Sequence, residues 1–123
     1  MTTLSLKRVY QPPGDGDGTR ILVDRLWPRG LTKEKARIDL WLKDIAPSDA
    51  LRKCFHGKPD DWDAFRAAYA VELERAAGQA AVHELLARLR NGPVTLLYAA
   101  RDELQNNAVA LREWLEQYRQ ARD

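Results

Sequence analysis

Residues 22–30, with the sequence LVDRLWPRG, constrain the fold of this chain more than any other stretch. The apolar run from Ile21 to Val23 is typical of a strand that is covered on both faces of a sheet. The run stops at charged residues and at Pro28, which favours extended geometry at Trp27 and stiffens the loop. Because ligands of open α/β sheets bind beyond the carboxyl ends of the strands, this stretch predicts one edge of a binding site.

A second stretch has the same form. Residues 94–98, VTLLY, are a candidate strand, and the charged sequence AARD follows them directly. Their continuous apolar character predicts a central position in the sheet. Because the carboxyl ends of parallel strands lie at one edge of a sheet, we expect Asp24 and Arg101 to come close together.

The order of the apolar patterns predicts an α/β fold. Strands are predicted at residues 5–10, 20–24, 38–44 and 94–98, and helices at residues 33–36, 48–57, 60–77, 80–91 and 102–118. Long helices between the third and fourth strands favour parallel pairing, with helices on both faces of the sheet. We therefore expect a single three-layer α/β domain over residues 1–123, with about four mostly parallel strands.

Periodicity also predicts the helix boundaries and the core. Gly57 is expected to cap the helix that begins at Ser48, and Gly78 is expected to separate the two long helices. Asp102 and Gln105 resemble a capping box at the start of the last helix. Alternation places Ile38, Leu40 and Leu42 on one face of the third strand. The predicted core side chains are Leu22, Val23, Leu40, Leu42, Phe65, Tyr69, Leu73, Leu86, Leu96, Leu97, Leu111 and Leu115.

Composition argues against several classes of function. The chain has 20 basic and 18 acidic residues, and a net charge of +2 is too small to predict a nucleic-acid or anionic-membrane partner. No apolar run approaches the roughly 18 residues that a membrane-spanning helix needs. A lone cysteine, Cys54, cannot form an internal disulfide, so we expect a cytoplasmic protein. Its apolar neighbours in the predicted helix favour a buried thiol over a nucleophile.

The sequence predicts no cofactor and no metal. The loop at residues 14–18 alternates Asp and Gly but lacks the later glutamate and the spacing of a calcium-binding loop. His56 and His83 have no second metal ligand at helical spacing. The chain also lacks the glycine-rich signatures of nucleotide-binding loops and the nucleophile elbow of hydrolases.

The carboxyl edge of the predicted sheet collects the residues that could carry a function. Arginines offer forked donors that suit carboxylate or phosphate, and the start of the last helix adds backbone N–H groups. The expected ligand is a small phosphorylated or carboxylated metabolite or a nucleotide fragment. The predicted ligand-binding residues are Arg25, Trp27, Arg29, Lys43, Arg101, Asn106 and Asn107. If the site performs a reaction, which the sequence does not name, the catalytic candidates are Asp24, Tyr98 and Asp102.

Three alternatives remain open. Asp24 could pair with Arg25, Arg101 or Lys43 and hold loops together as a structural ion network. The chain could also be a non-catalytic interaction protein. As a third alternative, the helices at residues 60–77 and 80–91 could contact nucleic acid, but their exposed faces carry both signs of charge, which is unfavourable for binding phosphates.

The sequence resembles the bacterial family catalogued as domain of unknown function 488, in its compact YeaO-like branch. Residues 22–30 are the most specific match. Further matches are RVY at residues 8–10, KEKA at residues 33–36, LWLKDIAPS at residues 40–48 and GPVTLLYAA at residues 92–100. The resemblance covers nearly the whole chain and implies a small three-layer α/β domain in a cytosolic bacterial protein. It implies no activity.

The chain departs from the family pattern in two places. Larger members have a helix between the first two strands, where this chain has a loop rich in glycine and proline. Because a parallel crossover normally needs a dozen or more residues, the direction of the first strand stays open. Some members carry histidine where this chain has Asn106 and Asn107, which argues against histidine-dependent chemistry here.

Overall fold

The computed structural model describes residues 3–55 and 61–122, and its centre is a sheet of four parallel strands. The strands β1 (Leu4–Arg8), β2 (Thr19–Leu22), β3 (Leu40–Trp41) and β4 (Val94–Tyr98) lie in the order β1-β4-β2-β3. Every residue of β4 is buried between its two neighbours. The predicted parallel sheet, with its fourth strand inside, is therefore confirmed.

The direction of β1, which the sequence left open, is parallel to β4. Leu4 lies opposite Val94, and Arg8 lies opposite Tyr98. The loop of residues 9–18, which contains the 3-10 helix η1, is long enough to return to the start of β2. A strand of 5 residues spans only about 16 Å at about 3.3 Å per residue, so no crossover helix is needed.

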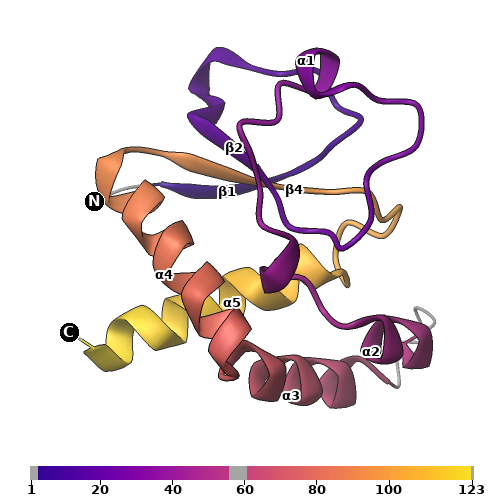
Figure 1. The fold of residues 1–123 in the computed structure, drawn as a ribbon, viewed down its shortest axis with the longest axis vertical. Coiled ribbons are helices and arrows are strands. Elements are labelled where there is room, and N and C mark those ends of the chain that lie inside the picture. The colour runs from indigo at the N-terminus through magenta and orange to yellow at the C-terminus, as the bar shows by residue number, and fades with distance from the viewer. Residues whose placement is uncertain (1–2, 56–60, 123) are drawn as a thin grey trace.

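Three helices cover one face of the sheet: α3 (Trp62–Leu73), α4 (Ala76–Asn91) and α5 (Asn107–Arg122). In Figure 1 they lie below the strands, and the short α2 (Asp49–Cys54) packs against α3. The one-turn α1 (Lys33–Ala36) and the loops beside it cover the opposite face (Figure 1). This arrangement confirms the predicted three-layer α/β class. Every helix in the described part of the chain is too short or too polar to cross a bilayer.

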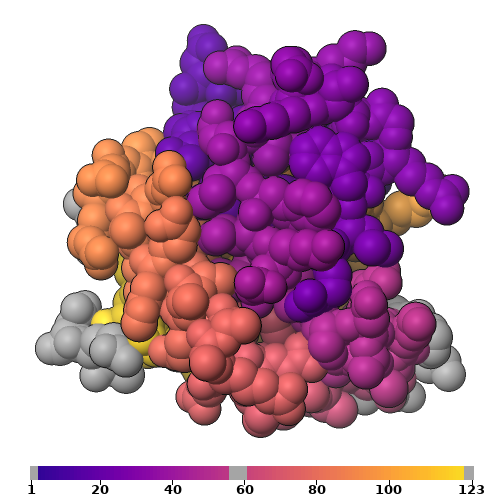
Figure 2. Space-filling view, viewed as in Figure 1, coloured from indigo at the N-terminus to yellow at the C-terminus, as the bar shows by residue number. Residues whose placement is uncertain are grey.

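Two hydrophobic clusters fill the space between the layers, because neighbouring residues of β2 and β4 point to opposite faces. Ile21 and Leu96 belong to the larger cluster, beneath α3, α4 and α5. Leu22 and Leu97 belong to the smaller cluster, beneath α1. On the face of the molecule drawn in the space-filling view, the segments around α1 form the upper part, and α3 and α4 form the lower part (Figure 2).

Most of the predicted core side chains are buried, with three exceptions. Leu40, Leu42 and Leu86 are only half-buried at the border of the larger cluster. The first two lie at the edge of the sheet, where one side lacks a neighbouring strand. In α4 the buried face runs through Val82, Leu85 and Leu89, and Leu86 lies at its border.

The third strand is much shorter than the predicted residues 38–44. β3 spans only Leu40–Trp41, and the 3-10 helix η2 (Lys43–Ile45) follows it. Pairing stops because its neighbour β2 ends at Leu22. The predicted shared face is also wrong, because Ile38 belongs to the smaller cluster and Leu40 packs against the larger one.

The break between the two long helices lies before Gly78 rather than at it. α3 ends at Leu73 and α4 begins at Ala76, so Gly78 is inside the first turn of α4. A Cβ atom at Gly78 would lie 2.8 Å from the carbonyl oxygen of Glu72. Glycine is therefore required for close contact between the helices, not for an interruption.

The last helix starts later than predicted. α5 begins at Asn107, while Asp102 lies in the preceding turn and accepts two backbone amides within that turn. The side chain that caps α5 is Asn106, whose Oδ1 accepts the amide of Val109 at 2.9 Å. The predicted capping box at Asp102 is therefore wrong.

Predictions around α2 have mixed outcomes. Cys54 is exposed at the end of α2, so the predicted burial of its thiol is wrong. The apolar neighbours of Cys54 in the sequence predicted burial of the thiol, but none of the α2 residues is buried. The predicted cap at Gly57, the helix start at Asp60 and His56 lie outside the described residues.

Candidate functional site

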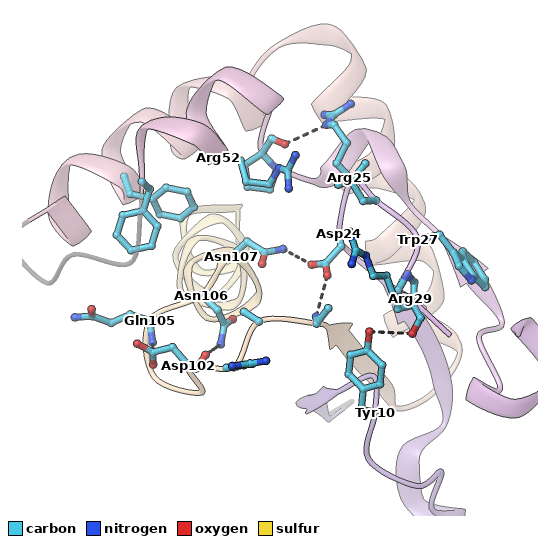
Figure 3. Close-up of a pocket in the computed structure, with 18 residues that line it drawn as sticks. Tyr10, Asp24, Arg25, Trp27, Arg29, Arg52, Asp102, Gln105, Asn106 and Asn107 are labelled. Carbon is cyan, nitrogen blue, oxygen red and sulfur yellow. Dashed lines mark hydrogen bonds between the residues drawn. The ribbon is translucent and has the colours of Figure 1, made fainter. Parts of the chain in front are cut away.

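A cleft of about 540 Å³ opens at the carboxyl edge of the sheet (Figure 3). Its walls come from the segments that follow β1, β2 and β4, together with α2 and the start of α5. Parallel strands bring these segments together because all of them leave the sheet at the same edge. The cleft therefore lies where the sequence predicted a site.

Asp24 lies at the meeting point of three of these segments. Its Oδ2 accepts the backbone amide of Ala99 at 2.8 Å, and its Oδ1 accepts Nδ2 of Asn107 at 3.0 Å (Figure 3). Asn107 also donates to the carbonyl of Val23 at 3.0 Å. The ends of β2 and β4 and the first residue of α5 are thus joined at one carboxylate.

The carboxyl group of Asp24 has only uncharged hydrogen-bond partners. In the described part of the chain, none of the ion pairs includes it. Burial raises the pKa of Asp24 above its usual value, against the opposing effects of the bonds from Asn107 and Ala99 and the charge of Arg52. The cleft therefore contains a carboxyl group whose negative charge is not neutralised by direct contact.

Three of the four arginines that line the cleft follow the ends of β2 and β4, and they fall into two groups. Arg25 donates to the carbonyls of Pro47 and Ala46, both at 3.1 Å, so its guanidinium holds the chain ahead of α2. The side chains of Arg29 and Arg101 are exposed at the cleft and have no hydrogen bond or ion pair within residues 3–55 and 61–122. These two guanidinium groups are available to an anion.

Aromatic side chains form part of the walls. Trp27 packs edge-on against Trp41 at 5.3 Å between ring centroids, and its indole nitrogen donates to the carbonyl of Leu31 at 2.7 Å. On another wall of the cleft, the ring centroids of Phe55 and Phe65 lie 4.6 Å apart. Such walls offer apolar contact to the uncharged part of a ligand.

Two predicted site residues lie away from the cleft. The ammonium group of Lys43 is over the ring of Trp41, at 5.3 Å from the centroid, and does not line the cleft. Tyr98 is buried in the larger cluster, and this burial raises the pKa of its hydroxyl. Lys43 was misplaced because the predicted third strand ends earlier than expected.

Two other predicted residues line the cleft but are occupied by local contacts. The hydrogen bonds from the amides of Gln105 and Leu104 lower the pKa of Asp102, which is exposed and ionised. Asn106 is buried. Its Oδ1 accepts a hydrogen bond from the amide of Val109, and its Nδ2 donates one to the carbonyl of Asp102. Both side chains shape the turn before α5.

Sequence reasoning missed several residues of the cleft. Tyr10 follows β1 and donates its hydroxyl to the carbonyl of Arg29 at 3.2 Å. If β1 had been predicted to be parallel, Tyr10 would have been expected at the site, because the carboxyl end of β1 then lies at the same edge as those of β2 and β4. Arg52 and Phe55 come from α2, and no motif in the sequence indicates where that helix docks.

No group of three or more His, Cys, Asp or Glu side chains that could hold a metal occurs among the described residues. The charged and aromatic groups that line the cleft are the carboxyl groups of Asp24 and Asp102, several guanidinium groups and aromatic surface. Guanidinium groups bind oxyanions, and a carboxylate accepts hydrogen bonds from hydroxyl or amino groups. This combination suits a small polar ligand that carries negative charge.

Known proteins resemble the chain along almost its whole length, and a family model described as the inactive DUF488-N3 subclade matches residues 3–123. The uncharacterized protein YeaO of Escherichia coli is 46% identical over 112 residues, which cover 91% of this chain and 96% of that protein. The uncharacterized protein Rv3073c of Mycobacterium tuberculosis is 38% identical over 114 residues, which cover 93% of this chain and 94% of that protein. No solved structure matches. The chain therefore belongs to the DUF488 family, in the subclade described as inactive DUF488-N3.

Proposed function

We propose that this protein binds a small anionic metabolite or a nucleotide fragment in the cleft, without converting it. The observation that carries the proposal is the pair of guanidinium groups of Arg29 and Arg101. Both line the cleft, and neither has a side-chain partner in the part of the chain that the structure describes. Forked donors that face a cleft and lack an internal acceptor are typical of sites for carboxylate or phosphate.

A purely structural ion network would have a different geometry. Arginines that only hold loops together would be paired with neighbouring carboxylates such as Asp24, Asp44 or Asp102. Arg25 is bonded to two backbone carbonyls instead, and no ion pair of the described residues involves these three aspartates. The unneutralised charges therefore favour a ligand over a network.

Binding without turnover agrees better with the chemistry of the cleft than catalysis does. The hydrogen bonds of Asp24 to Ala99 and Asn107 give its carboxyl group a structural role, because they join the ends of β2 and β4 to the start of α5. Tyr98 is buried outside the cleft, and Asp102 is bonded to backbone amides of its own turn. The description of the matching subclade as inactive supports the same conclusion.

Nucleic-acid binding has less support. On α3, Arg66 pairs with Asp63 at 2.9 Å and with Glu113 at 2.7 Å. On α4, Arg88 pairs with Glu84 at 3.2 Å. Because these basic side chains already have acidic partners, they offer little uncompensated charge to phosphates.

Nuclear magnetic resonance titration with inorganic phosphate and with small phosphorylated and carboxylated compounds tests the proposal. The backbone amides of Ala99 and Arg101 should shift on binding. Arg29→Ala and Arg101→Ala should each weaken binding by about 1–3 kcal/mol with little change in melting temperature. Arg90→Ala is the matched control, because Arg90 is exposed on α4, away from the cleft. Unchanged affinity in both cleft variants, or binding that Arg90→Ala also weakens, would contradict the proposal.

A further inference from the structure

The carboxyl group in an anion-binding cleft needs an explanation. Asp24 lines the same cleft as Arg29, Arg52 and Arg101. An ionised carboxylate repels an oxyanion, since both groups then present only acceptor lone pairs and negative charge. We infer that Asp24 is a specificity determinant: the cleft accepts anions that carry their own hydrogen-bond donor, such as monohydrogen phosphate, and rejects fully deprotonated ones, such as sulfate. This inference rests on the anion-binding function proposed above.

The hydrogen bonds of Asp24 leave room for a donor from the ligand. Each of its oxygens accepts one bond from the protein, from Ala99 at 2.8 Å and from Asn107 at 3.0 Å. An ionised carboxylate oxygen can accept about two bonds, so each oxygen retains one acceptor position. A hydroxyl group of the ligand could occupy it.

The charged and titratable groups around Asp24 do not neutralise it by contact. Arg25 is bonded to backbone carbonyls, and Arg52 pairs with Asp49 at 3.1 Å. Tyr69 donates its hydroxyl to the carbonyl of Ile45, and burial raises the pKa of that hydroxyl, so it stays neutral. The remaining charged and titratable side chains of the cleft are Tyr10, Arg29, Arg101 and Asp102.

The selectivity follows from the nature of the contact. A protonated anion donates its hydroxyl to a carboxylate oxygen of Asp24, which forms an O–H···O⁻ hydrogen bond that is charge-assisted and strong. With a deprotonated anion, two acceptors of like charge face each other and no proton lies between them. Specificity of this kind depends on repulsion of the wrong ligand as much as on attraction of the right one.

Phosphate and sulfate are the appropriate probes because both are tetrahedral and of similar size, but only phosphate retains a proton near neutral pH. Both would be titrated at matched ionic strength and about pH 7.5, with the Ala99 amide and the Asn107 side-chain amide as reporters. We expect phosphate to bind at least about tenfold more tightly than sulfate. In Asp24→Asn the preference should fall below about threefold, because the amide has no charge and offers donors. Asp44→Asn is the control, since Asp44 is exposed and lies outside the cleft.

A second measurement needs no substitution, in case Asp24→Asn does not fold. Lowering the pH protonates Asp24, which removes the repulsion, while sulfate stays fully ionised. Because burial raises the pKa of Asp24 above its usual value, the change begins above the pH expected for an exposed aspartate. In the unsubstituted protein, sulfate affinity should therefore rise at least about tenfold between about pH 7.5 and the lower pH at which a carboxyl titration shows Asp24 to be protonated.

The possible outcomes separate this inference from the proposed function. A preference for phosphate that disappears in Asp24→Asn, or at low pH, supports the inference. Equal affinities for phosphate and sulfate would overturn it and leave anion binding intact. A preference that persists unchanged in a folded Asp24→Asn variant would also overturn it. If neither anion binds the unsubstituted protein or the variant at any pH, both the inference and the proposed function are wrong.

Discussion

The backbone amide of Ala99 donates to Oδ2 of Asp24 across 2.8 Å, and this bond joins the ends of two strands that are distant in sequence. Ala99 follows β4, and Asp24 lies just beyond β2. Asn107 at the start of α5 bonds the other oxygen of the same carboxylate. The group that we assign to ligand selection is therefore also part of the framework of the fold.

Removal of the Asn107 side chain should affect both stability and the titration of Asp24. Asn107→Ala deletes the bonds to Asp24 and to the carbonyl of Val23. We expect a loss of about 1–3 kcal/mol in the free energy of unfolding. The pKa of Asp24 should rise further, because the bond from Asn107 now opposes the effect of burial. Urea unfolding and a carboxyl titration followed by nuclear magnetic resonance would measure the two effects, and Asn91→Ala, at an exposed position, should change neither.

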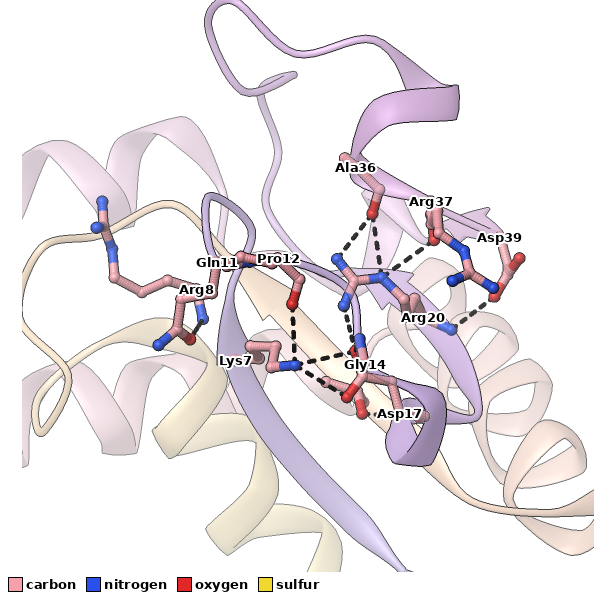
Figure 4. Close-up of polar contacts among 11 residues, drawn as sticks. Lys7, Arg8, Gln11, Pro12, Gly14, Asp17, Arg20, Ala36, Arg37 and Asp39 are labelled. Carbon is pink, nitrogen blue, oxygen red and sulfur yellow. Dashed lines mark hydrogen bonds and ion pairs between the residues drawn. The ribbon is translucent and has the colours of Figure 1, made fainter.

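A second polar cluster lies around the start of β2 (Figure 4). Asp17 accepts hydrogen bonds from Lys7 at 3.1 Å, from the amide of Gly14 at 2.9 Å, and from Arg20. Arg20 is only 2% exposed and also donates to the carbonyl of Ala36. These contacts join β1, η1, β2 and α1.

Asp17 should therefore make the stability of the protein depend on pH. Burial alone would raise the pKa of Asp17, but the bonds from Gly14, Lys7 and Arg20 outweigh burial and hold the pKa below its usual value. A lowered pKa in the folded state contributes stability that is present above the unfolded-state pKa of about 3.9 and is lost as the pH falls through the folded-state pKa.

We expect Asp17→Asn to lower the free energy of unfolding by about 1–3 kcal/mol at neutral pH. The difference from the unsubstituted protein should shrink below about pH 4, where Asp17 itself becomes protonated. Urea unfolding at several pH values would measure this. Asp15→Asn, at an exposed position in the same 3-10 helix, should have no such effect. A pH-independent loss would mean that the charge of Asp17 is not what stabilises the cluster.

Leu96→Ala should strongly destabilise the protein. Leu96 is fully buried at the centre of β4 and belongs to the larger hydrophobic cluster. Loss of its burial together with the cavity left behind should cost about 2–5 kcal/mol. Urea unfolding would measure the loss, with Val71→Ala as a control because Val71 is 58% exposed. A loss below roughly 1 kcal/mol would be inconsistent with a packed central strand.

The parts of the fold that the sequence predicts best are those with strong local patterns. β2 and β4 are recognisable because their continuous apolar runs suit strands buried on both faces. The boundaries of β3 cannot be recognised from the sequence, because the length of this strand depends on where β2 ends. The alternating pattern of the sequence continues beyond the paired residues. Tertiary pairing rather than local preference decides that boundary.

The candidate site was predictable to a similar extent. Asp24, Arg29 and Arg101 converge because parallel strands end at one edge, which a sequence pattern can indicate. Arg52 reaches the cleft only because contacts distant in sequence place α2. Ser48 donates to Glu72 through its amide at 2.8 Å and its hydroxyl at 2.6 Å, and no local pattern encodes that pairing.

Gly78 gives a direct test of the contact between α3 and α4. Its ideal Cβ position lies 2.8 Å from the carbonyl oxygen of Glu72 and 3.0 Å from the Cα of Leu73, both backbone atoms. Alanine normally favours a helix over glycine by about 1 kcal/mol, but here its methyl group must push the helices apart. We expect Gly78→Ala to lower the free energy of unfolding by about 1–3 kcal/mol. Gly16→Ala, where no atom lies within 4 Å of the added Cβ, should be nearly neutral in the same urea unfolding measurement. A stabilised Gly78→Ala variant would show that helix propensity outweighs the close approach.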